Sequence, residues 1–384
     1  MKINNRLTGI EEYHFKKIEN FKKRLIKEGK NILDLSIGDP DLEVNKEIVN
    51  ELINSFNVKG FNKYPPYEGI KELKTKVIKY YSERFNVKLE EEEVLILIGS
   101  KEGINNIIPA VCNIGDFMIV PNPCYQVYVT SPILWGVNTY KLPIRDINNY
   151  LPELDKIPEN ISKKSKMFII NYPNNPTGAQ ANEAFFKEII KFCEEKNIIL
   201  VNDSAYIEIV NEHKKPISLL QVDKAKKSVE IGTFSKTFNM TGFRIGYAVG
   251  NSKVLKELLK VKSNVDSGQF LPIQYAAIKA LDILELEVCK NRKIYDARRE
   301  KAKSILKAKN IEYYDSEATF YIWCKVPEDY TTTEFYEKLV YNYGIITTPG
   351  YCFGNLGNGY FRLSLTKDLK DIDKYLSKIE ENSH

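Results

Sequence analysis

Residues 94–103 read VLILIGSKEG, a short apolar run followed by a polar turn. The run at residues 94–98 consists of valine, leucine and isoleucine, which is typical of a strand buried on both faces of a sheet. A glycine ends the run, and residues 102–111 then repeat apolar side chains at helical spacing. This stretch predicts a strand that turns directly into a helix, the unit from which parallel α/β sheets are built.

The same unit recurs along the chain. Further apolar runs predict strands at residues 117–120, 167–171, 198–202, 229–234 and 245–249, and helical patterns cover residues 125–135, 183–196 and 253–260. Strands this apolar predict a largely parallel α/β sheet with helices on both faces. Ligands of such sheets bind at the carboxyl ends of the strands, so the polar residues that follow these runs are the first candidates for a site.

The two ends of the chain have a different pattern. Residues 11–28 predict one long, charged amphipathic helix, and a second long helix is expected from about residue 286. Short strands near residues 319–325, 344–347 and 360–365 follow, and then a last helix. We therefore expect a large domain at residues 44–285, and a smaller α/β domain in which the N-terminal segment, residues 1–43, joins residues 286–384.

The composition argues against several classes of protein. A net charge of +5, from 56 basic and 51 acidic residues, gives little support for a nucleic-acid partner. The six cysteines are far apart and form no C-x-x-C pair, so neither a zinc site nor a secreted disulfide framework is indicated. No run of about 18 apolar residues and no apolar signal core occur, so we expect a cytoplasmic protein without a membrane partner.

Histidine is scarce. The three histidines are His14, His213 and His384, and none lies in a motif. A Ser-His-Asp hydrolase and a histidine-rich metal site are therefore not expected, and we predict no metal. Acid–base chemistry in this chain would fall to lysine, tyrosine or a carboxylate.

One lysine lies in unusual company. Residues 233–244 read TFSKTFNMTGFR, which places Lys236 among the hydroxyl groups of Thr233 and Ser235 and eight residues before Arg244. By itself, a lysine at the end of a strand is usually an exposed surface residue. Hydroxyl donors and a planar arginine beside it are, however, what an amine needs to form a Schiff base with a phosphorylated aldehyde.

This motif, extended to TFSKTFNMTGFRIGY, resembles the lysine motif of the class I/II aminotransferases, which are fold-type I enzymes that use pyridoxal phosphate. The resemblance covers nearly the whole chain and implies a mostly parallel seven-stranded sheet in the large domain. It also implies that Lys236 binds the cofactor covalently and moves the substrate's proton. Thr233 and Arg244 would hold the cofactor's phosphate, with Ser235 close to it.

Two motifs that follow candidate strands fit the same family. Residues 174–178, Asn-Asn-Pro-Thr-Gly, would form a tight turn in any protein. In the family, however, the counterpart of Asn175 bonds the cofactor's phenolic oxygen beside the substrate. Asp203 could simply cap a helix. The Asp-x-Ala-Tyr pattern resembles the family's, in which the counterpart of Asp203 keeps the pyridine nitrogen protonated and that of Tyr206 donates to the phenolic oxygen.

The resemblance assigns four further residues to the cofactor. The amides of Ser100 and Lys101, at a helix start that could also be merely capped, would hold the phosphate, and the role of the Lys101 side chain is left open. Tyr125 would stack on the cofactor ring, although it could instead be a core aromatic residue. The counterpart of Tyr64 reaches the phosphate of the neighbouring subunit, which implies a homodimer with shared active sites.

An arginine in an apolar strand completes the predicted site. Arg362, in the stretch Tyr-Phe-Arg-Leu-Ser, resembles the arginine that binds the substrate's α-carboxylate, although a structural ion pair is the alternative. Gly38, in Ile-Gly-Asp-Pro, would bring the backbone close to the same carboxylate. Catalysis is assigned to Lys236, Asp203 and Tyr206.

The function implied is transfer of an amino group from an L-amino acid to a 2-oxo acid in a ping-pong cycle between pyridoxal and pyridoxamine phosphate. The stretches IGDPD, GSKEG and SKTFNMTGFRIG resemble the branch of the family that contains LL-diaminopimelate aminotransferase and broad-specificity relatives. A pyridoxal-phosphate-dependent C–S β-lyase could use the same residues. A non-catalytic regulator on the same scaffold is a further alternative, although such regulators carry an added DNA-binding domain for which this chain has no spare segment.

Overall fold

The structure is a computed structural model that describes residues 4–10 and 14–380. Its centre is a seven-stranded sheet with the order β2-β8-β7-β6-β5-β3-β4. All of its strands are parallel except β8, which runs antiparallel to both neighbours. The bounds are β2 (Val94–Leu97), β3 (Phe117–Asn122), β4 (Asn138–Pro143), β5 (Ser165–Ile170), β6 (Ile199–Asp203), β7 (Val229–Thr233) and β8 (Gly246–Gly250). The predicted seven-stranded, mainly parallel sheet is confirmed.

Alternate residues of each strand enter different cores. In β5, Met167 and Ile169 pack with α4 (Ser100–Val111), α5 (Val127–Trp135) and α10 (Ser252–Val265). Their neighbours Phe168 and Ile170 face the opposite way and join the core that α7 (Glu183–Lys196) covers. This two-sided burial is the reason that the strand sequences are almost continuously apolar. Because the strands β3 to β7 are parallel, the residues that follow them lie at one edge of the sheet.

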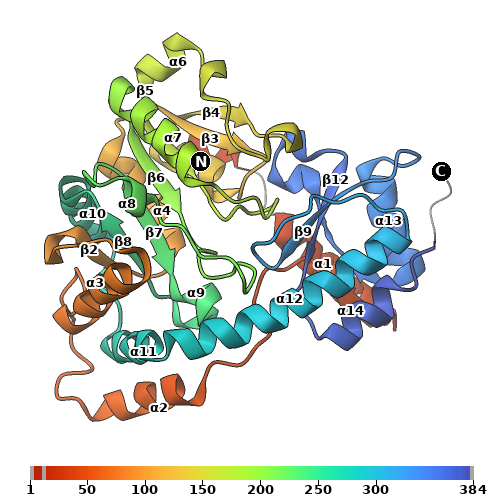
Figure 1. Cartoon of the computed structure of the whole chain (residues 1–384), viewed down its shortest axis with the longest axis horizontal. Coiled ribbons are helices and arrows are strands. Elements are labelled where there is room, and N and C mark those ends of the chain that lie inside the picture. Colours follow the sequence, from red (N-terminus) through yellow and green to blue (C-terminus); the bar gives the residue numbers. More distant parts are fainter. Residues whose placement is uncertain (1–3, 11–13, 381–384) are drawn as a thin grey trace.

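Further helices cover the β2 end of the sheet. There α3 (Lys71–Phe85) and α11 (Leu271–Asp282) pack against one another, and α2 (Lys46–Asn54) lies along α11 (Figure 1). The short helices α6 (Glu159–Lys164), α8 (Leu219–Val222) and α9 (Phe234–Thr237) connect strands, and α9 is the single turn that carries Lys236 directly after β7.

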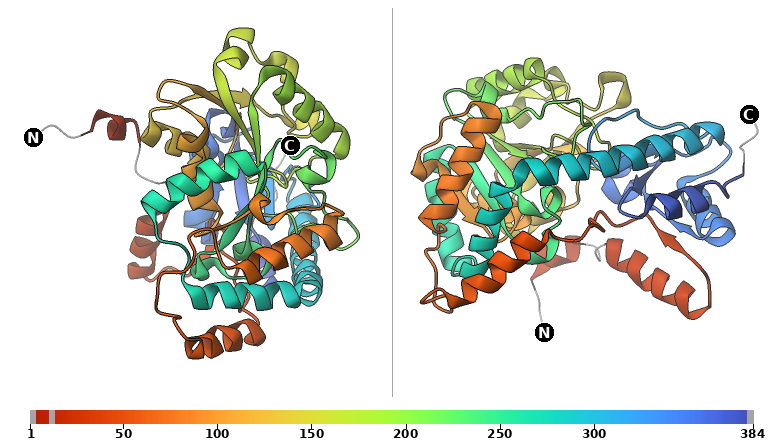
Figure 2. Two further views of the ribbon diagram at one scale, coloured as in Figure 1. Left: turned by 90° about the vertical axis from the view of Figure 1, so that its left-hand side faces the viewer. Right: turned by 60° about the horizontal axis from the view of Figure 1, so that its bottom comes forward.

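The elements from the two ends of the chain pack together. The long helix α12 (Leu284–Ala308) runs from the sheet toward them (Figure 1). There β9 (Tyr321–Lys325), β11 (Thr348–Pro349) and β12 (Tyr360–Ser364) form an antiparallel sheet, while β1 (Leu33–Asp34) pairs in parallel with β10 (Ile345–Ile346). Helices α13 (Thr332–Tyr343) and α14 (Leu369–Leu376) complete this part. Figure 2 shows α1 (His14–Lys27) beside it, where Ile18 and Leu25 pack against Val340 and Ile346.

A buried ion cluster fixes α3 and α12 to the segment after β6. Glu208 is 1% exposed and accepts hydrogen bonds from Tyr80, Arg84 and Arg292. Arg84 also bonds Glu285, which lies at the surface. Each charge buried here has an opposite charge or a hydroxyl partner, as burial of an ion requires.

The structure shifts several predicted boundaries. The predicted helix at residues 125–135 begins at Val127, the one at 253–260 extends over Ser252–Val265, and the third C-terminal strand ends at Ser364. The N-terminal helix covers His14–Lys27, and residues 11–13 of that prediction lie outside the described residues. The elements that the sequence does not predict are helices α2, α3, α6, α8, α9, α11 and α13 and strands β1, β4 and β11.

Candidate active site

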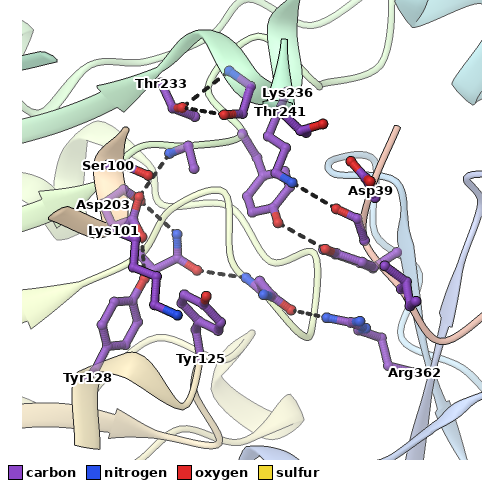
Figure 3. A pocket seen from close by; sticks show the side chains of 18 of the residues that line it. Asp39, Ser100, Lys101, Tyr125, Tyr128, Asp203, Thr233, Lys236, Thr241 and Arg362 are labelled. Atoms are coloured by element: carbon purple, nitrogen blue, oxygen red, sulfur yellow. Dashed lines mark hydrogen bonds between the residues drawn. The ribbon is translucent and has the colours of Figure 1, made fainter. Parts of the chain in front are cut away.

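A cavity of about 480 Å³ opens between the carboxyl edge of the seven-stranded sheet and the elements from the ends of the chain. It is lined by all the predicted site residues except Tyr64 and by several residues that were not predicted. The predicted residues in its wall are Gly38, Ser100, Lys101, Tyr125, Asn175, Asp203, Tyr206, Thr233, Ser235, Lys236, Arg244 and Arg362. In Figure 3, Lys236 lies between Asp203, on the sheet side, and Arg362, on the opposite side.

One end of the cavity gathers hydroxyls, backbone amides and cations. Ser100 begins α4 directly after β2, so its amide lies at a helix N-terminus. The hydroxyl of Thr233 bonds that of Ser235 at 3.0 Å and accepts the Ser235 amide at 3.2 Å. Partial burial, together with the charge of Arg244, lowers the pKa of Lys101. This end has the donors and the positive charge that a phosphate group needs.

Two glycines keep this end open. Gly99 has φ +79°, and a Cβ there would lie 2.6 Å from Nη2 of Arg244. A Cβ on Gly246 would lie 2.9 Å from the amide nitrogen of Ser100. Only glycine therefore lets the start of β8 and the arginine approach the start of α4 this closely.

The amine of Lys236 lies at the centre of the cavity. Its Nζ donates to the carbonyl oxygen of Gly38 at 2.7 Å. Burial lowers the pKa of Lys236 to about 8. The negative charge of Asp39 opposes this shift, and the positive charge of Arg362 adds to it. A larger share of this amine is therefore neutral near physiological pH than of an ordinary lysine, and the neutral form is the nucleophile.

Asp203 is held on two sides at the end of β6. One carboxylate oxygen accepts the hydroxyl of Tyr128 at 2.6 Å, and the other accepts the amide of Ala205 at 3.2 Å. Burial raises the pKa of Asp203 to about 6, against the two hydrogen bonds and the charge of Lys236, which lower it. A carboxylate that remains ionised in so poorly hydrated a place favours a positive charge on a group brought against it.

Arg362 forms the opposite wall. Its side chain is 1% exposed, and its guanidinium donates to Oδ1 of Asn175 at 2.7 Å and to the carbonyl oxygen of Ser36 at 2.6 Å. The guanidinium also lies 4.0 Å from the ring centre of Tyr321 and 4.8 Å from that of Phe353. These four partners are uncharged, and they hold the guanidinium at the cavity wall.

The remaining aromatic residues border the same space. Tyr206 is buried after β6, and its hydroxyl lies 2.9 Å from that of Tyr321. Tyr125 lines the cavity and meets the ring of Tyr128 edge to face, with 5.8 Å between ring centres. Tyr64 is different, because it is 81% exposed and lies outside the cavity wall of this chain.

Several lining residues were missed in the sequence, namely Asp39, Tyr128, Asn171, Thr241 and Tyr321. A signal existed for Tyr128, which follows Tyr125 by three residues at the start of a predicted helix and so faces the same side. Tyr321 lies in a C-terminal strand and reaches the cavity only through the tertiary fold. Nothing in its local sequence marks it.

The cavity suits pyridoxal phosphate at each of its chemical groups. The cations and amides at the α4 end suit the phosphate, Lys236 suits the aldehyde, and Asp203 suits a protonated ring nitrogen. Sheet and cavity together define the class of protein, an α/β enzyme whose cavity suits a phosphorylated aldehyde as cofactor.

Comparison with known proteins agrees with this class. The sequence model of the family described as aminotransferase class I and II matches residues 30–379. The chain belongs to this family, whose members are pyridoxal-phosphate-dependent aminotransferases. It is 44% identical over 366 residues to an LL-diaminopimelate aminotransferase of Aquifex aeolicus, with 95% of each chain covered. It is 40% identical over 380 residues to an LL-diaminopimelate aminotransferase of Halothermothrix orenii, with 98% of each covered.

Solved structures have the same fold. Substrate-bound BacF from Bacillus subtilis superimposes with a TM-score of 0.94 at 30% identity, with 100% of both chains covered. A mutant aspartate aminotransferase of Thermus thermophilus has a TM-score of 0.92 at 22% identity, with 98% of both chains covered. The predicted family, fold type, cofactor and aminotransferase activity are confirmed, and the C–S β-lyase alternative is not favoured. Among the described residues, no helix is long and apolar enough to cross a membrane.

Proposed function

We propose that this aminotransferase binds its amino-acid substrate through Arg362 and uses Lys236 both to hold pyridoxal phosphate and to move the proton of the substrate's Cα. When bound, the cofactor supplies an electron sink for the charge left on that carbon. One observation carries the proposal: a single cavity contains the lysine amine of lowered pKa, the buried carboxylate of Asp203 and the buried guanidinium of Arg362.

Each remaining residue has a role in positioning. Ser100, Lys101, Thr233, Ser235 and Arg244 hold the phosphate. Tyr125 stacks on the ring, Asp203 keeps the ring nitrogen protonated, and the amide of Asn175 and the hydroxyl of Tyr206 donate to the phenolic oxygen. Arg362 and the backbone of Gly38 orient the α-carboxylate, so that the Cα proton faces Nζ of Lys236. The geometry supports these roles because all of these side chains border one cavity.

For the amino donor we propose LL-diaminopimelate or a closely similar amino acid. The two relatives with the quoted identities are both LL-diaminopimelate aminotransferases and match nearly the whole chain. The motifs IGDPD and GSKEG, which resemble the same branch, line the cavity through Gly38 and Asp39 and through Ser100 and Lys101. The acceptor would be a 2-oxo acid such as 2-oxoglutarate.

The decisive experiment combines cofactor fixation with a donor panel. Borohydride should fix the cofactor irreversibly to Lys236 in the wild type, and peptide mapping should find no label in Lys236→Ala. Lys253→Arg, at an exposed lysine, is the control that should label normally. Candidate donors are then offered with 2-oxoglutarate or pyruvate. Release of ammonia and pyruvate from a single substrate would indicate a β-lyase, whereas a lack of label on Lys236 would refute the proposed mechanism.

We also propose that the protein is a homodimer in which Tyr64 of each chain reaches the phosphate in its neighbour's cavity. The position of Tyr64 supports this, because an 81% exposed tyrosine outside its own cavity is available to a second chain. The cavity would then be complete only in the dimer.

Subunit mixing tests this arrangement. Lys236→Ala and Tyr64→Ala should each be impaired alone, the first because it lacks the amine and the second because both of its sites lack the tyrosine. A hybrid of the two contains one site with both Lys236 and Tyr64, so activity should rise on mixing after reversible dissociation. No rise, with hybrid formation verified by differential tagging, would place Tyr64 outside the shared site.

Two broader predictions remain proposals. Residues 1–43 and 286–384 would form a smaller domain beside a large domain at residues 44–285, which the pairing of β1 with β10 supports.

A cytoplasmic location is proposed because all six cysteines are free thiols, with only Cys289 exposed.

A further inference from the structure

Tyr321 lies where three parts of the predicted site meet. It is 2% exposed, belongs to β9 and lines the cavity. Its hydroxyl contacts the hydroxyl of Tyr206, its ring faces the guanidinium of Arg362, and its Oη packs against Gly38. The first of these residues is assigned to the cofactor and the other two to the substrate's carboxylate, so one side chain connects both binding functions.

The hydroxyl pair has a preferred direction once the cofactor is bound. The two oxygens are 2.9 Å apart, and either could donate to the other. Tyr206 has one proton, which it uses if it donates to the phenolic oxygen of the cofactor. The proton between the two tyrosines must then come from Tyr321. A hydroxyl that accepts a hydrogen bond becomes a stronger donor, so Tyr321 would strengthen the bond that Tyr206 donates.

The ring acts on the arginine. In the β9–β12 pair, Arg362 lies opposite Trp323. Tyr321 precedes Trp323 by two residues in β9, so the side chains of Tyr321 and Trp323 lie on the same face of the sheet as that of Arg362. The guanidinium is 4.0 Å from the centre of the Tyr321 ring and 4.8 Å from that of the Phe353 ring. A cation held over an aromatic face in a desolvated place is attracted to it, and the flat ring also restricts the plane of the guanidinium.

We propose that Tyr321 is a positioning residue for both ends of the reaction: its hydroxyl directs and strengthens the hydrogen bond that Tyr206 donates to the cofactor, and its ring fixes the plane in which Arg362 receives the substrate's carboxylate. This inference rests on the proposed function, because it presumes that Tyr206 and Arg362 have the roles assigned above. Tyr321 itself takes no proton from the substrate and forms no bond to it.

Two substitutions separate the hydroxyl from the ring. Tyr321→Phe removes the hydroxyl and keeps the ring. It should raise the pH at which the visible absorption band of the bound cofactor titrates, in the same direction as Tyr206→Phe but by less, because the bond to the phenolic oxygen is weakened and not lost. It should leave the dissociation constant of a substrate-like dicarboxylate, measured by its effect on that band, nearly unchanged.

Tyr321→Leu removes both features. It should reproduce the spectroscopic shift and in addition weaken dicarboxylate binding about thirty-fold, the fold-change that corresponds to a desolvated cation–π contact. KM for the amino donor should rise with it. Tyr295→Phe is the matched control, because Tyr295 is a fully buried tyrosine of the same core outside the cavity wall, and it should change neither quantity.

The outcomes distinguish this inference from the proposed function. If borohydride fixes no cofactor on Lys236 of the wild type, the proposed function fails first and this inference fails with it. If the wild type is labelled but Tyr321→Phe titrates like the wild type, the role of the hydroxyl is refuted. If Tyr321→Leu binds dicarboxylate as tightly as Tyr321→Phe does, the role of the ring is refuted. Melting temperatures of the variants without cofactor show whether folding contributes.

Discussion

The guanidinium of Arg362 donates to Oδ1 of Asn175 at 2.7 Å, which joins the strand β12 to the loop after β5. The carbonyl half of the amide is thereby committed to the arginine, and the NH₂ half is left to donate elsewhere. In the proposed function, Asn175 thus has one face for Arg362, which would bind the substrate's carboxylate, and one for the cofactor. The two binding events would be coupled through this single side chain.

Substitution of Asn175 by alanine should therefore weaken both events. The buried arginine loses one acceptor, which costs about 1–3 kcal/mol, and the cofactor loses one donor. We expect the free energy of unfolding to fall by that amount, and KM for the amino acid and for the 2-oxo acid to rise because the guanidinium is no longer held toward the carboxylate. Cofactor affinity, measured by titration of the apoenzyme, should fall as well. A rise in KM with unchanged cofactor affinity would mean that Asn175 serves only the arginine.

Gly38 is constrained by Tyr321 and not by its own backbone. A Cβ at residue 38 would lie 1.7 Å from Oη of Tyr321 and 2.7 Å from its Cζ. We therefore expect Gly38→Ala to displace Tyr321 and to lower kcat/KM strongly. The double variant Gly38→Ala/Tyr321→Ala removes the collision, so its loss should be smaller than the sum of the two single losses. Additive losses in this double-mutant cycle would contradict the packing described here.

The phosphate-binding role of Arg244 can be tested by the choice of ligand. Arg244→Gln removes a cation beside Lys101 and the α4 N-terminus, so the affinity of the apoenzyme for pyridoxal phosphate should fall. Affinity for pyridoxal, which lacks the phosphate, should change little. Because the charge of Arg244 contributes to the lowered pKa of Lys236, removing it should also raise that pKa slightly. Equal losses for both ligands would indicate a general disturbance of the cavity.

The sequence predicts the centre of the fold better than its edges. The strands that were located are continuous apolar runs because helices cover both of their faces. The edge strand β4 (Asn138–Pro143) was missed because it is half exposed and reads NTYKLP, without an apolar run. Helix α3 was also missed, although Leu73, Val77 and Tyr81 recur at helical spacing and are buried, so its sequence does carry the signal.

The site follows the same division. Residues at or just beyond the carboxyl ends of strands, such as Asp203 and Lys236, could be found because the carboxyl edge of a parallel sheet is where ligands bind. Tyr128 and Tyr321 could not be assigned a role, because their partners are distant in the sequence and only the fold brings them within hydrogen-bond range. The role proposed for Tyr64 involves a second chain and stays a prediction.

Asp203 should destabilise the protein without its cofactor at neutral pH. Burial raises the pKa of this carboxyl from 3.8 to about 6, so the folded state holds its proton more tightly than the unfolded state. Stability from this group is present at low pH and is lost as pH rises through about 6. A shift of about two units corresponds to about 3 kcal/mol at pH 7.

Asp203→Asn should therefore raise the melting temperature of the apoenzyme at pH 7 relative to the wild type. The difference in melting temperature should shrink as pH falls below about 6, because the wild-type carboxyl is then protonated and, like the asparagine of the variant, uncharged. With cofactor present the order should reverse, because the variant cannot hold the ring nitrogen protonated and binds the cofactor less well. A difference in the apoenzymes that does not depend on pH would show that ionisation of Asp203 is not its cause.

Glu208 is expected to contribute much more to stability than its neighbour Glu285, although both bond Arg84. Glu208 is 1% exposed and accepts from two arginines and a tyrosine, whereas the side chain of Glu285 is 76% exposed. Removing one partner of a buried ion pair leaves the other charge uncompensated, which costs about 3–5 kcal/mol. An exposed pair is screened by water and contributes about 1 kcal/mol or less.

Glu208→Gln should therefore lower the urea midpoint substantially, and Glu285→Gln should lower it little, when both are compared at equal protein and cofactor concentrations. Because Arg84 is common to both pairs, the comparison isolates burial as the variable. Added salt should reduce the small effect of Glu285→Gln and leave the effect of Glu208→Gln nearly unchanged. Equal shifts for the two variants would mean that water reaches Glu208, and that packing alone fixes α3 and α12 to the sheet.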